Sequence, residues 1–398
     1  MDARTTAVAW ESLAWERDPK QPLSRSRRAQ ISSTYEAAVP ASIATLVPDV
    51  DPTTLAVADD ARAEISRFDA ELSATLPGTE LAPLAAVLLR TESASSSQIE
   101  HVTAGARALA LAEIDLARPG SNAELVAANV DAMTRAIDLA EEISPATILA
   151  VHEALMRGEP LASPGRLRTE QVWVGGSGVS PHGASYVAPH HSRVAAAMDD
   201  LCEFVGRSDL PLLVQCAIAH AQLETIHPFT DGNGRVGRAL VHAMLQHAGA
   251  TTRATVPVSA GLLGDTEGYF AALTAYREGD ASPIVDRFAE ATFAAIGNGR
   301  ELAGELVEIH EGWASAISAR RTAAIWRALP LLLRQPAITS AIVQRELGLS
   351  QPAADAVIAR LRDAGVVTKA AGRQRYVAWV APQVTSALDA FAERARRG

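Results

Sequence analysis

The sequence predicts an all-α protein that carries one small β-hairpin and a separate C-terminal module. Three features indicate this. Alanine, leucine and arginine are abundant, and apolar residues recur every three or four positions along most of the 398 residues. A short stretch between residues 166 and 190 alternates like paired strands. From residue 331 onwards, two helical segments precede two short strand-like segments.

The N-terminal part is expected to be helical after an irregular start. Residues 1–50 contain Trp10, Trp15, Pro40 and Pro48 without a clear period, so we expect no regular structure there. The apolar spacing, with breaks near Pro77 and Pro145, then predicts helices over 56–75, 79–115, 122–143 and 145–157.

Strand-like residues interrupt the helices in the middle of the chain. Gln171–Val174 and Ala184–Ala188 alternate, and the glycines at 175–178 indicate a turn between them, so this stretch predicts a β-hairpin. Helices are expected again over 192–206, 210–226 and up to about residue 247.

Residues 331–380 predict a winged helix. The pattern is a helix, a turn, a second helix and two strands, at Ile338–Leu347, Gly348–Ser350, Gln351–Ala364, Val366–Thr368 and Arg375–Trp379. We therefore expect four parts in the chain: an N-terminal helical extension, a core, a helical connector and the winged helix, at 1–110, 111–300, 301–330 and 331–398.

Composition excludes several classes of protein. The formal net charge of −10 argues against a nonspecific nucleic-acid binder. Lys20 and Lys369 are the only lysines, and neither fits a Walker A loop or the strand lysine of a protein kinase. Any triphosphate must therefore be held by arginines, backbone amides and metal.

Cysteine content and hydropathy indicate a cytoplasmic protein. Cys202 and Cys216 cannot form a disulfide framework or a cysteine-rich metal site. The start of the chain lacks the apolar stretch of a signal peptide, and no apolar run is long enough to cross a bilayer. We expect no membrane contact.

The segment 227–238 reads His-Pro-Phe-Thr-Asp-Gly-Asn-Gly-Arg-Val-Gly-Arg and contains the parts of an anion site. Its glycines let the backbone turn, and Asn233 stands where the next helix begins, so free amides and the helix dipole converge there. Arg235 and Arg238 are three residues apart and share one face of that helix. Two guanidinium groups beside free amides suit a polyphosphate.

Two more residues complete a phosphoryl- or nucleotidyl-transfer site. Asp231 supplies a hard oxygen ligand of the kind that Mg²⁺ prefers. His227 can take a proton near neutral pH. The alternative is a glycine-rich helix connector with two solvated arginines, but a base, a metal ligand and an arginine pair in one short segment favour the transfer site.

The segment matches the motif of the Fic family, His-Pro-Phe-x-Asp/Glu-Gly-Asn-Gly-Arg-x-x-Arg, at every defined position. The chain resembles the family over about residues 30–300. The other stretches that carry the resemblance are Tyr35–Pro40, Val151–Met156, Pro164–Arg166, Gln171–Gly175, Tyr269 and Arg277–Asp280. The resemblance implies a helical Fic core with the hairpin at 166–190 as its flap.

The resemblance also implies a protein adenylyltransferase, which transfers AMP from ATP to a Ser, Thr or Tyr hydroxyl of a target protein and releases pyrophosphate. His227 would be the base, Asp231 would hold Mg²⁺ against the α- and β-phosphates, and Phe229 would be an apolar wedge that fixes the loop. The residues implied to bind the nucleotide are Gly232, Asn233, Gly234, Arg235, Gly237, Arg238 and Tyr269.

Residues Ser96–Glu100 resemble the family's inhibitory signature, Ser/Thr-x-x-x-Glu followed by Gly or Asn. The resemblance implies that Ser96 and Glu100 are regulatory and that Glu100 pairs with Arg238. This pair would displace the γ-phosphate and leave ATP in an unproductive pose. The departure from the family pattern is His101, where Gly or Asn is usual. Without the motif downstream, a glutamate on a helix indicates only a solvated surface charge.

Three alternative functions stay open. The enzyme could remove AMP, with Glu100 positioning a water. The core could only sense nucleotide in a DNA-binding regulator, although an intact His227 argues against this. Another phosphate-containing group, such as UMP or phosphocholine, could be transferred.

Two regions are candidate docking surfaces. A segment of the target protein could add to the flap at 166–190 as an extra strand, held by main-chain hydrogen bonds. The winged helix carries basic residues that suit either contacts with DNA phosphates or a module for a protein partner or a homodimer. These residues are Arg345, Arg360, Arg362, Lys369, Arg373 and Arg375.

Overall fold

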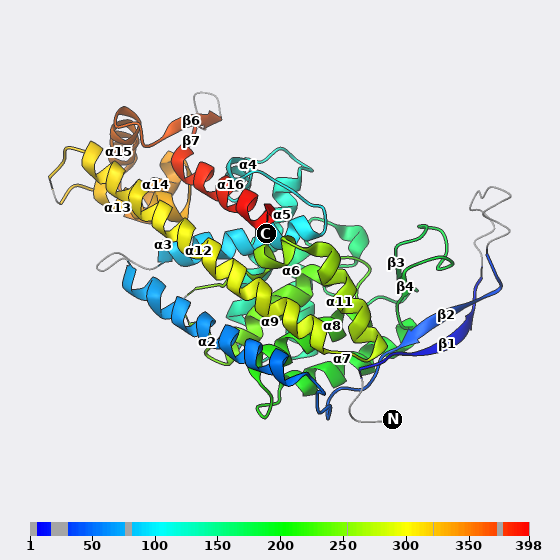
Figure 1. Cartoon of the computed structure of the whole chain (residues 1–398). Helices are drawn as coiled ribbons and strands as arrows, with labels where there is room; N and C mark the ends of the chain where they lie inside the picture. The colour runs from blue at the N-terminus through cyan, green and yellow to red at the C-terminus, as the bar shows by residue number, and fades with distance from the viewer. Residues whose placement is uncertain are drawn as a thin grey trace. The chain divides into compact units, whose positions relative to one another are not determined.

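The computed structural model describes residues 6–16, 31–75, 82–252, 254–320, 322–371 and 377–397. The chain divides into two compact units, each assembled from separate stretches of sequence. The first unit comprises Met1–Asp59, Arg135–His247 and Glu267–Phe288. The second unit comprises Asp60–Thr134, Ala248–Thr266 and Ala289–Gly398. Helices dominate the described residues, which confirms the predicted fold class (Figure 1).

Helix α8 (Leu212–Ile226) is the most buried helix of the first unit, with every residue after the first buried. It packs against α7 (His191–Val205) and α9 (Asn233–His247). Because no face of α8 meets water, its polar side chains find partners inside the protein. The Tyr276 hydroxyl, for example, donates to Gln222 Oε1 at 2.8 Å. The other helical elements here are α6 (Pro145–Leu155), the 3₁₀ turn η1 (Pro160–Ala162) and α11 (Thr266–Glu278).

In the described residues of the first unit two hairpins form, although the sequence predicted one. The predicted hairpin is present, with β3 (Trp173–Val174) antiparallel to β4 (Tyr186–Val187). A second hairpin pairs β1 (Ala9–Ala14) with β2 (Thr34–Val39), so the expectation of an irregular N-terminus was wrong. Residues 15–33 separate β1 from β2 in the sequence, far more than the two to five residues of a hairpin loop that can be predicted from its sequence.

The two hairpins pack against each other. Tyr35 and Ala37 of β2 are buried with Val187 of β4, and the Trp15 ring meets the Trp173 ring edge to face at a centroid distance of 5.8 Å. The buried face gives β2 its stability, since an isolated two-stranded hairpin is marginal in water.

Helix α3 (Ala82–Ile99) in the second unit is followed by α4 (Ala106–Ala112). The sequence predicted one helix over 79–115, which was wrong because the chain turns between them. His101 takes a left-handed φ of 62°, and Gly105 precedes α4 in an extended conformation. A left-handed residue ends a helix by redirecting the chain.

Other helices of the described residues are α2 (Pro52–Thr75), α5 (Asn122–Asp138), α10 (Val258–Leu263), α12 (Ser282–Ala316) and α13 (Ile325–Arg334). The C-terminal elements follow the predicted order of helix, turn, helix and strand pair. They are β5 (Ala337–Ile338), α14 (Ser340–Leu347), α15 (Gln351–Asp363), β6 (Thr368–Ala371), β7 (Ala378–Val380) and α16 (Pro382–Arg397). The three strands form one antiparallel sheet in the order β5-β7-β6.

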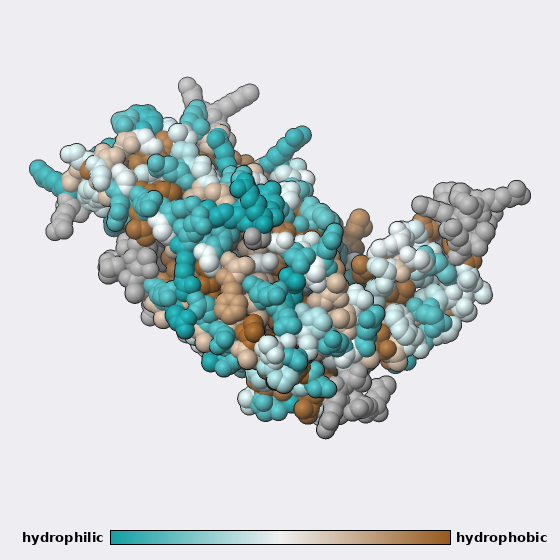
Figure 2. Space-filling model, viewed as in Figure 1, coloured by the Kyte–Doolittle hydropathy of each residue, from teal (hydrophilic) through white to brown (hydrophobic). Residues whose placement is uncertain are grey.

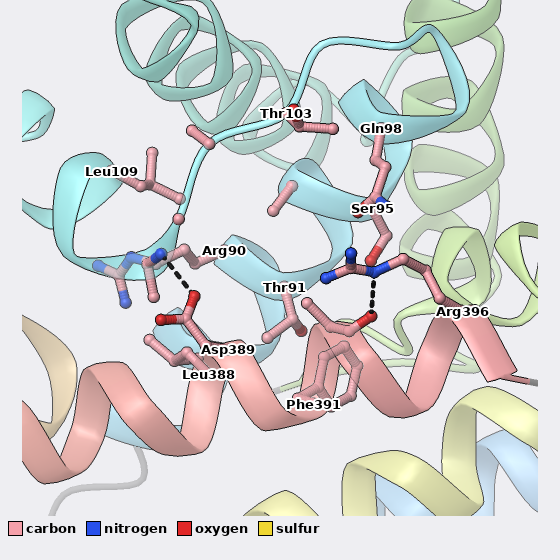
Figure 3. A pocket seen from close by; sticks show the side chains of 15 residues that line it. Arg90, Thr91, Ser95, Gln98, Thr103, Leu109, Leu388, Asp389, Phe391 and Arg396 are labelled. Carbon is pink, nitrogen blue, oxygen red and sulfur yellow. Dashed lines mark hydrogen bonds between the residues drawn. The ribbon is translucent and has the colours of Figure 1, made fainter.

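The surface is mixed in polarity. On the face shown in Figure 2, hydrophilic residues cover much of the described surface and apolar residues lie among them in small groups. Within the described ranges, no helix is both long enough and apolar enough to span a bilayer.

The close approach of α10 to α12 gives a test of the second unit's packing. An added Cβ at Gly261 would overlap the carbonyl oxygen and Cα of Ala291, whereas an added Cβ at Gly304 meets nothing within 4 Å. We expect Gly261→Ala to lower the free energy of unfolding by about 1–3 kcal/mol. Gly304→Ala, the matched control, should raise it by about 0.5–1 kcal/mol.

Urea unfolding of both variants measures these changes. Equal stabilities for Gly261→Ala and the wild type would contradict the close packing of α10 on α12.

Candidate active site

The segment 227–238 links α8 to α9 and begins with a left-handed residue. His227 caps α8 with φ 49° and ψ 61°, and its amide donates to Leu223 O at 2.8 Å. A non-glycine residue rarely takes this conformation, and it persists only where the surroundings fix it. The residues packed around His227 therefore fix its left-handed backbone conformation.

Donors from outside α8 reach the last carbonyls of this helix. Arg277 Nη2 donates to Glu224 O at 3.2 Å, and the Tyr186 hydroxyl donates to Thr225 O at 2.6 Å. Arg168 Nε donates to His227 O at 2.8 Å. The final carbonyls of a helix have no intrahelical partner, so these donors close the end of α8.

Glu224 lies beside the imidazole of His227. The Glu224 carboxylate oxygen is 3.7 Å from His227 Nδ1, and both side chains are largely buried, with exposed fractions of 11% and 17%. The side chain proposed as the base thus has a carboxylate next to one ring nitrogen.

Asn233 holds the loop that follows His227. Its Oδ1 accepts from Phe229 N and its Nδ2 donates to Phe229 O, each at 2.9 Å. Both polar ends of the amide side chain are therefore engaged with one residue of the loop. Phe229 is fully buried, as expected of the apolar wedge.

His152 supports the same loop from α6. Its ring stacks on Phe229 at a centroid distance of 3.7 Å and an interplanar angle of 8°. Gly165 N donates to Nδ1 at 3.1 Å, so the proton is on Nε2, which lies 3.2 Å from Asp231 O. Burial lowers the pKa of His152 to about 4, which keeps the ring neutral at physiological pH.

Asp231 and Arg235 form the accessible edge of the site. The Asp231 side chain is 64% exposed, whereas that of Arg235 is 6% exposed, and Arg235 Nη2 lies 3.3 Å from Asp231 Oδ1. Gly232 turns the chain with φ 84°, and an added Cβ there would overlap Met156 Cε. The turn thus presents the Asp231 carboxylate to solvent directly before the amides that begin α9.

The Asp231 carboxylate fits the metal that the motif implies. An exposed carboxylate oxygen is a hard ligand, and Mg²⁺ is commonly bound by one or two carboxylates together with substrate phosphates. Within the ranges that the structure describes, no group of three or more His, Cys, Asp or Glu side chains is placed to hold a metal ion. A site of one carboxylate completed by phosphate oxygens needs no such group.

The other predicted nucleotide residues divide between the site and the core. Gly234 and the buried Arg238 lie in the first turns of α9. Gly237 lets α9 approach α8, since an added Cβ would come within 2.8 Å of His220 Nδ1. Tyr269 is fully buried with its hydroxyl 2.7 Å from His220 Nε2, so the structure places it in the core.

The predicted regulatory residues belong to the second unit. Ser96 is fully buried on α3, and Glu100 is exposed in the turn that follows this helix. The pairing of Glu100 with Arg238 of the first unit stays a prediction.

Sequence reasoning missed three residues that shape the site: Arg168, Tyr186 and His152. Each was inside a stretch that resembles the Fic family or its hairpin, but none belongs to the transfer motif. Only His152 carried a signal, since a histidine among apolar residues needs a partner, although the sequence does not say which one. Arg168 carried none, because its neighbours in the sequence include Arg166, Thr169 and Glu170.

Comparison with known proteins identifies the segment around this site. The model of the Fic/DOC family matches residues 142–245. Protein adenylyltransferase fic-1 of Caenorhabditis elegans is 32% identical over 158 residues, which cover 39% of this chain and 28% of that protein. Protein adenylyltransferase Fic of Nematostella vectensis is 28% identical over 163 residues, which cover 40% of this chain and 35% of that protein. The matched region thus spans about a third of the length of these relatives.

The fold of the chain resembles that of a solved protein. A Fic family protein from Desulfovibrio desulfuricans G20 aligns with a TM-score of 0.52 and 23% identity, covering 83% of this chain and 96% of that one. At this identity the likeness concerns the fold.

The two Asn233 bonds to Phe229 predict a local effect of substitution. In Asn233→Ala the Phe229 amide loses its acceptor, so its hydrogen exchange should accelerate on the order of tenfold. The Val236 amide, which donates to Gly232 O at 3.0 Å in the first turn of α9, is the internal control and should be less affected. Unchanged protection of Phe229, measured by NMR, would show that Asn233 does not hold the loop.

Proposed function

We propose that this chain, whose residues 142–245 form a domain of the Fic/DOC family, transfers AMP from ATP to a hydroxyl group of a target protein. The observation that carries the proposal is the fixed position of His227 directly before an accessible carboxylate and a helix N-terminus. The names of the relatives over this same region support the reaction. A base, a metal ligand and an anion site in this order suit nucleotidyl transfer.

His227 takes the proton in the proposed reaction. Glu224 lies beside Nδ1, which favours a proton on that nitrogen and leaves Nε2 to accept one from the target hydroxyl. The hydroxyl oxygen forms a bond to the α-phosphorus of ATP, and the bond from that phosphorus to the α–β bridging oxygen breaks. Pyrophosphate leaves with that electron pair.

The start of α9 binds the phosphates. The first amides of a helix have no intrahelical acceptor, so those of Asn233 and Gly234 are suited to phosphate oxygens. Arg235 and Arg238 add positive charge from the same helix. Asp231 would hold Mg²⁺, which supplies neutralising charge to the phosphates during transfer.

Glu100 inhibits the transfer in this proposal. The left-handed φ of 62° at His101 suits the Gly or Asn that the family pattern has at this position. The chain therefore turns directly after Glu100 although a histidine is present. A closed Glu100–Arg238 pair would remove the cation that receives the γ-phosphate and put a negative charge there instead.

The target protein binds through the β3–β4 hairpin in this proposal. A short hairpin with a backbone edge can pair with an extended segment, which selects little for sequence. Such pairing would carry the target hydroxyl towards His227.

The C-terminal winged helix is proposed to bind a protein rather than DNA. Arg345 Nε pairs with Glu346 at 3.0 Å, Arg362 pairs with Asp363 at 2.7 Å, and Arg360 donates to Ser318 O at 2.7 Å. Arg373 and Arg375 lie outside the described residues. The carboxylates beside Arg345 and Arg362 reduce the net positive charge that this surface offers to phosphates, and the Arg360 guanidinium is already bonded within the protein. Salt-sensitive binding of the full chain to duplex DNA would contradict this proposal.

His227→Ala should abolish AMP transfer while ATP binding survives. Removing a general base typically lowers the rate about 10²–10⁴-fold, whereas the phosphates are held by other residues. Incubation with α-labelled ATP, Mg²⁺ and a cell lysate measures transfer, and calorimetry measures ATP binding. His247→Ala is the control, because this histidine ends α9 and contacts Ala140 O. Undiminished labelling by His227→Ala would refute the mechanism.

Glu100→Gly should raise AMP transfer over the wild type in the same assay, because it frees Arg238 for the γ-phosphate. Glu100→Gln, which keeps the side-chain size, should raise it as well. Arg238→Ala in the Glu100→Gly background should remove the gain. Loss of AMP transfer in Glu100→Gly, together with AMP removal by the wild type, would instead favour the hydrolase in which Glu100 positions a water.

A further inference from the structure

Arg168 is a buried arginine between α6 and β3 that the transfer motif does not include. Its exposed fraction is 3%, and burial lowers the pKa of its guanidinium to about 10, so it remains charged at neutral pH. Among the residues that the structure describes, its hydrogen-bond acceptors are all backbone carbonyls rather than carboxylates. A buried cation satisfied in this way is unusual, since buried charges are normally paired.

Three segments of the first unit meet at this one guanidinium. Nη1 donates to Glu170 O at 2.8 Å, before β3, and Nη2 donates to Pro189 O at 2.6 Å, after β4. Nε donates to His227 O at 2.8 Å and Nη2 to Ile226 O at 3.4 Å, at the end of α8. The Arg168 amide also donates to Pro228 O at 3.0 Å. Both ends of the hairpin are thereby tied to the backbone of the proposed base.

The position of the charge explains why a cation is tolerated here. The carbonyl end of a helix carries partial negative charge, and a cation at that end is stabilising. Arg277 and Tyr186 donate hydrogen bonds to the carbonyls of Glu224 and Thr225. The Arg277 guanidinium also stacks over the Tyr186 ring at 3.8 Å. Together with Arg168 they provide a donor for every carbonyl from Glu224 to Pro228.

We propose that Arg168 is a positioning residue that fixes His227 relative to the β3–β4 hairpin. This inference rests on the proposed function, because the hairpin is where a target segment would bind. A planar fork of donors reaches several carbonyls at once, which the single ammonium of lysine cannot do. Loss of the Arg168 guanidinium should leave the phosphate-binding start of α9 intact. His227 and the β3–β4 hairpin would then lose the hydrogen bonds that connect them.

The first experiment compares Arg168→Lys and Arg168→Gln with the wild type in AMP transfer. We expect kcat to fall about 10²-fold, because a displacement of about 1 Å is enough for such a loss, while the Kd for ATP stays unchanged. Arg207→Gln is the matched control. Arg207 Nη1 also donates to backbone carbonyls, those of Ala44 and Leu46, in a loop that bears no site residue.

The second experiment reads the position of His227 without relying on activity. In the full chain with ¹³C-labelled histidine, the ring signal of His227, assigned by its loss in His227→Ala, should shift in Arg168→Lys. The His247 signal should stay in place. Should the Arg168 variants fail to fold, Tyr186→Phe removes one hydrogen bond of the same helix end and should give a several-fold loss of kcat with a smaller shift.

The outcomes separate the two hypotheses. Wild-type kcat together with an unmoved His227 signal in Arg168→Lys would overturn the positioning role, as would equal weakening of ATP binding and transfer. In the fallback case, a Tyr186→Phe variant with wild-type kcat and signal would overturn it as well. If the wild type transfers no AMP but the His227 signal still shifts in Arg168→Lys, the proposed function fails and the positioning role of Arg168 stands.

Discussion

The buried C-terminal end of α8 is the constraint on which the site depends. A helix end that is removed from water must find donors for its last carbonyls. The residues around β3 and β4 provide them through Arg168 and Tyr186, and α11 adds Arg277. Closing the helix end therefore joins the hairpin to His227. The stability of α8 and the geometry of the site are consequences of the same hydrogen bonds.

The loop after His227 combines a side chain fixed in the core with a carboxylate that is exposed to solvent. The Asn233 amide and the neutral His152 ring hold Phe229 in the core, while the Asp231 carboxylate remains largely exposed. Groups that are already in place need no rearrangement when a charged substrate binds, which is the physical basis of preorganised electrostatic catalysis. The buried bonds thus maintain the accessible edge of the site.

Much of the fold was predictable because α8, α9 and the C-terminal helices follow the apolar period of a helix. The transfer motif was predictable because its residues are contiguous. The β1–β2 hairpin was missed, since residues 15–33 separate its strands and no short hairpin turn such as Asn-Gly links them. The break after α3 was missed because His101 does not mark a left-handed turn as Gly would. The roles of Arg168 and His152 depend on hydrogen bonds to backbone groups that are distant in sequence. No local sequence pattern reveals such partners. The burial of Tyr269 against His220 likewise reflects tertiary packing.

The packing of β1 and β2 on the flap hairpin also bears on the order of folding. Trp15 and Tyr35 are near the N-terminus, but their partners Trp173 and Val187 lie far along the chain. Contacts between such distant residues carry a high entropic cost and form slowly. During synthesis β1 and β2 leave the ribosome before β3 and β4. They therefore lack their buried partners until the flap hairpin has also been made. The apolar face of β2 should therefore become protected from proteases only after residues 173–187 have been synthesised.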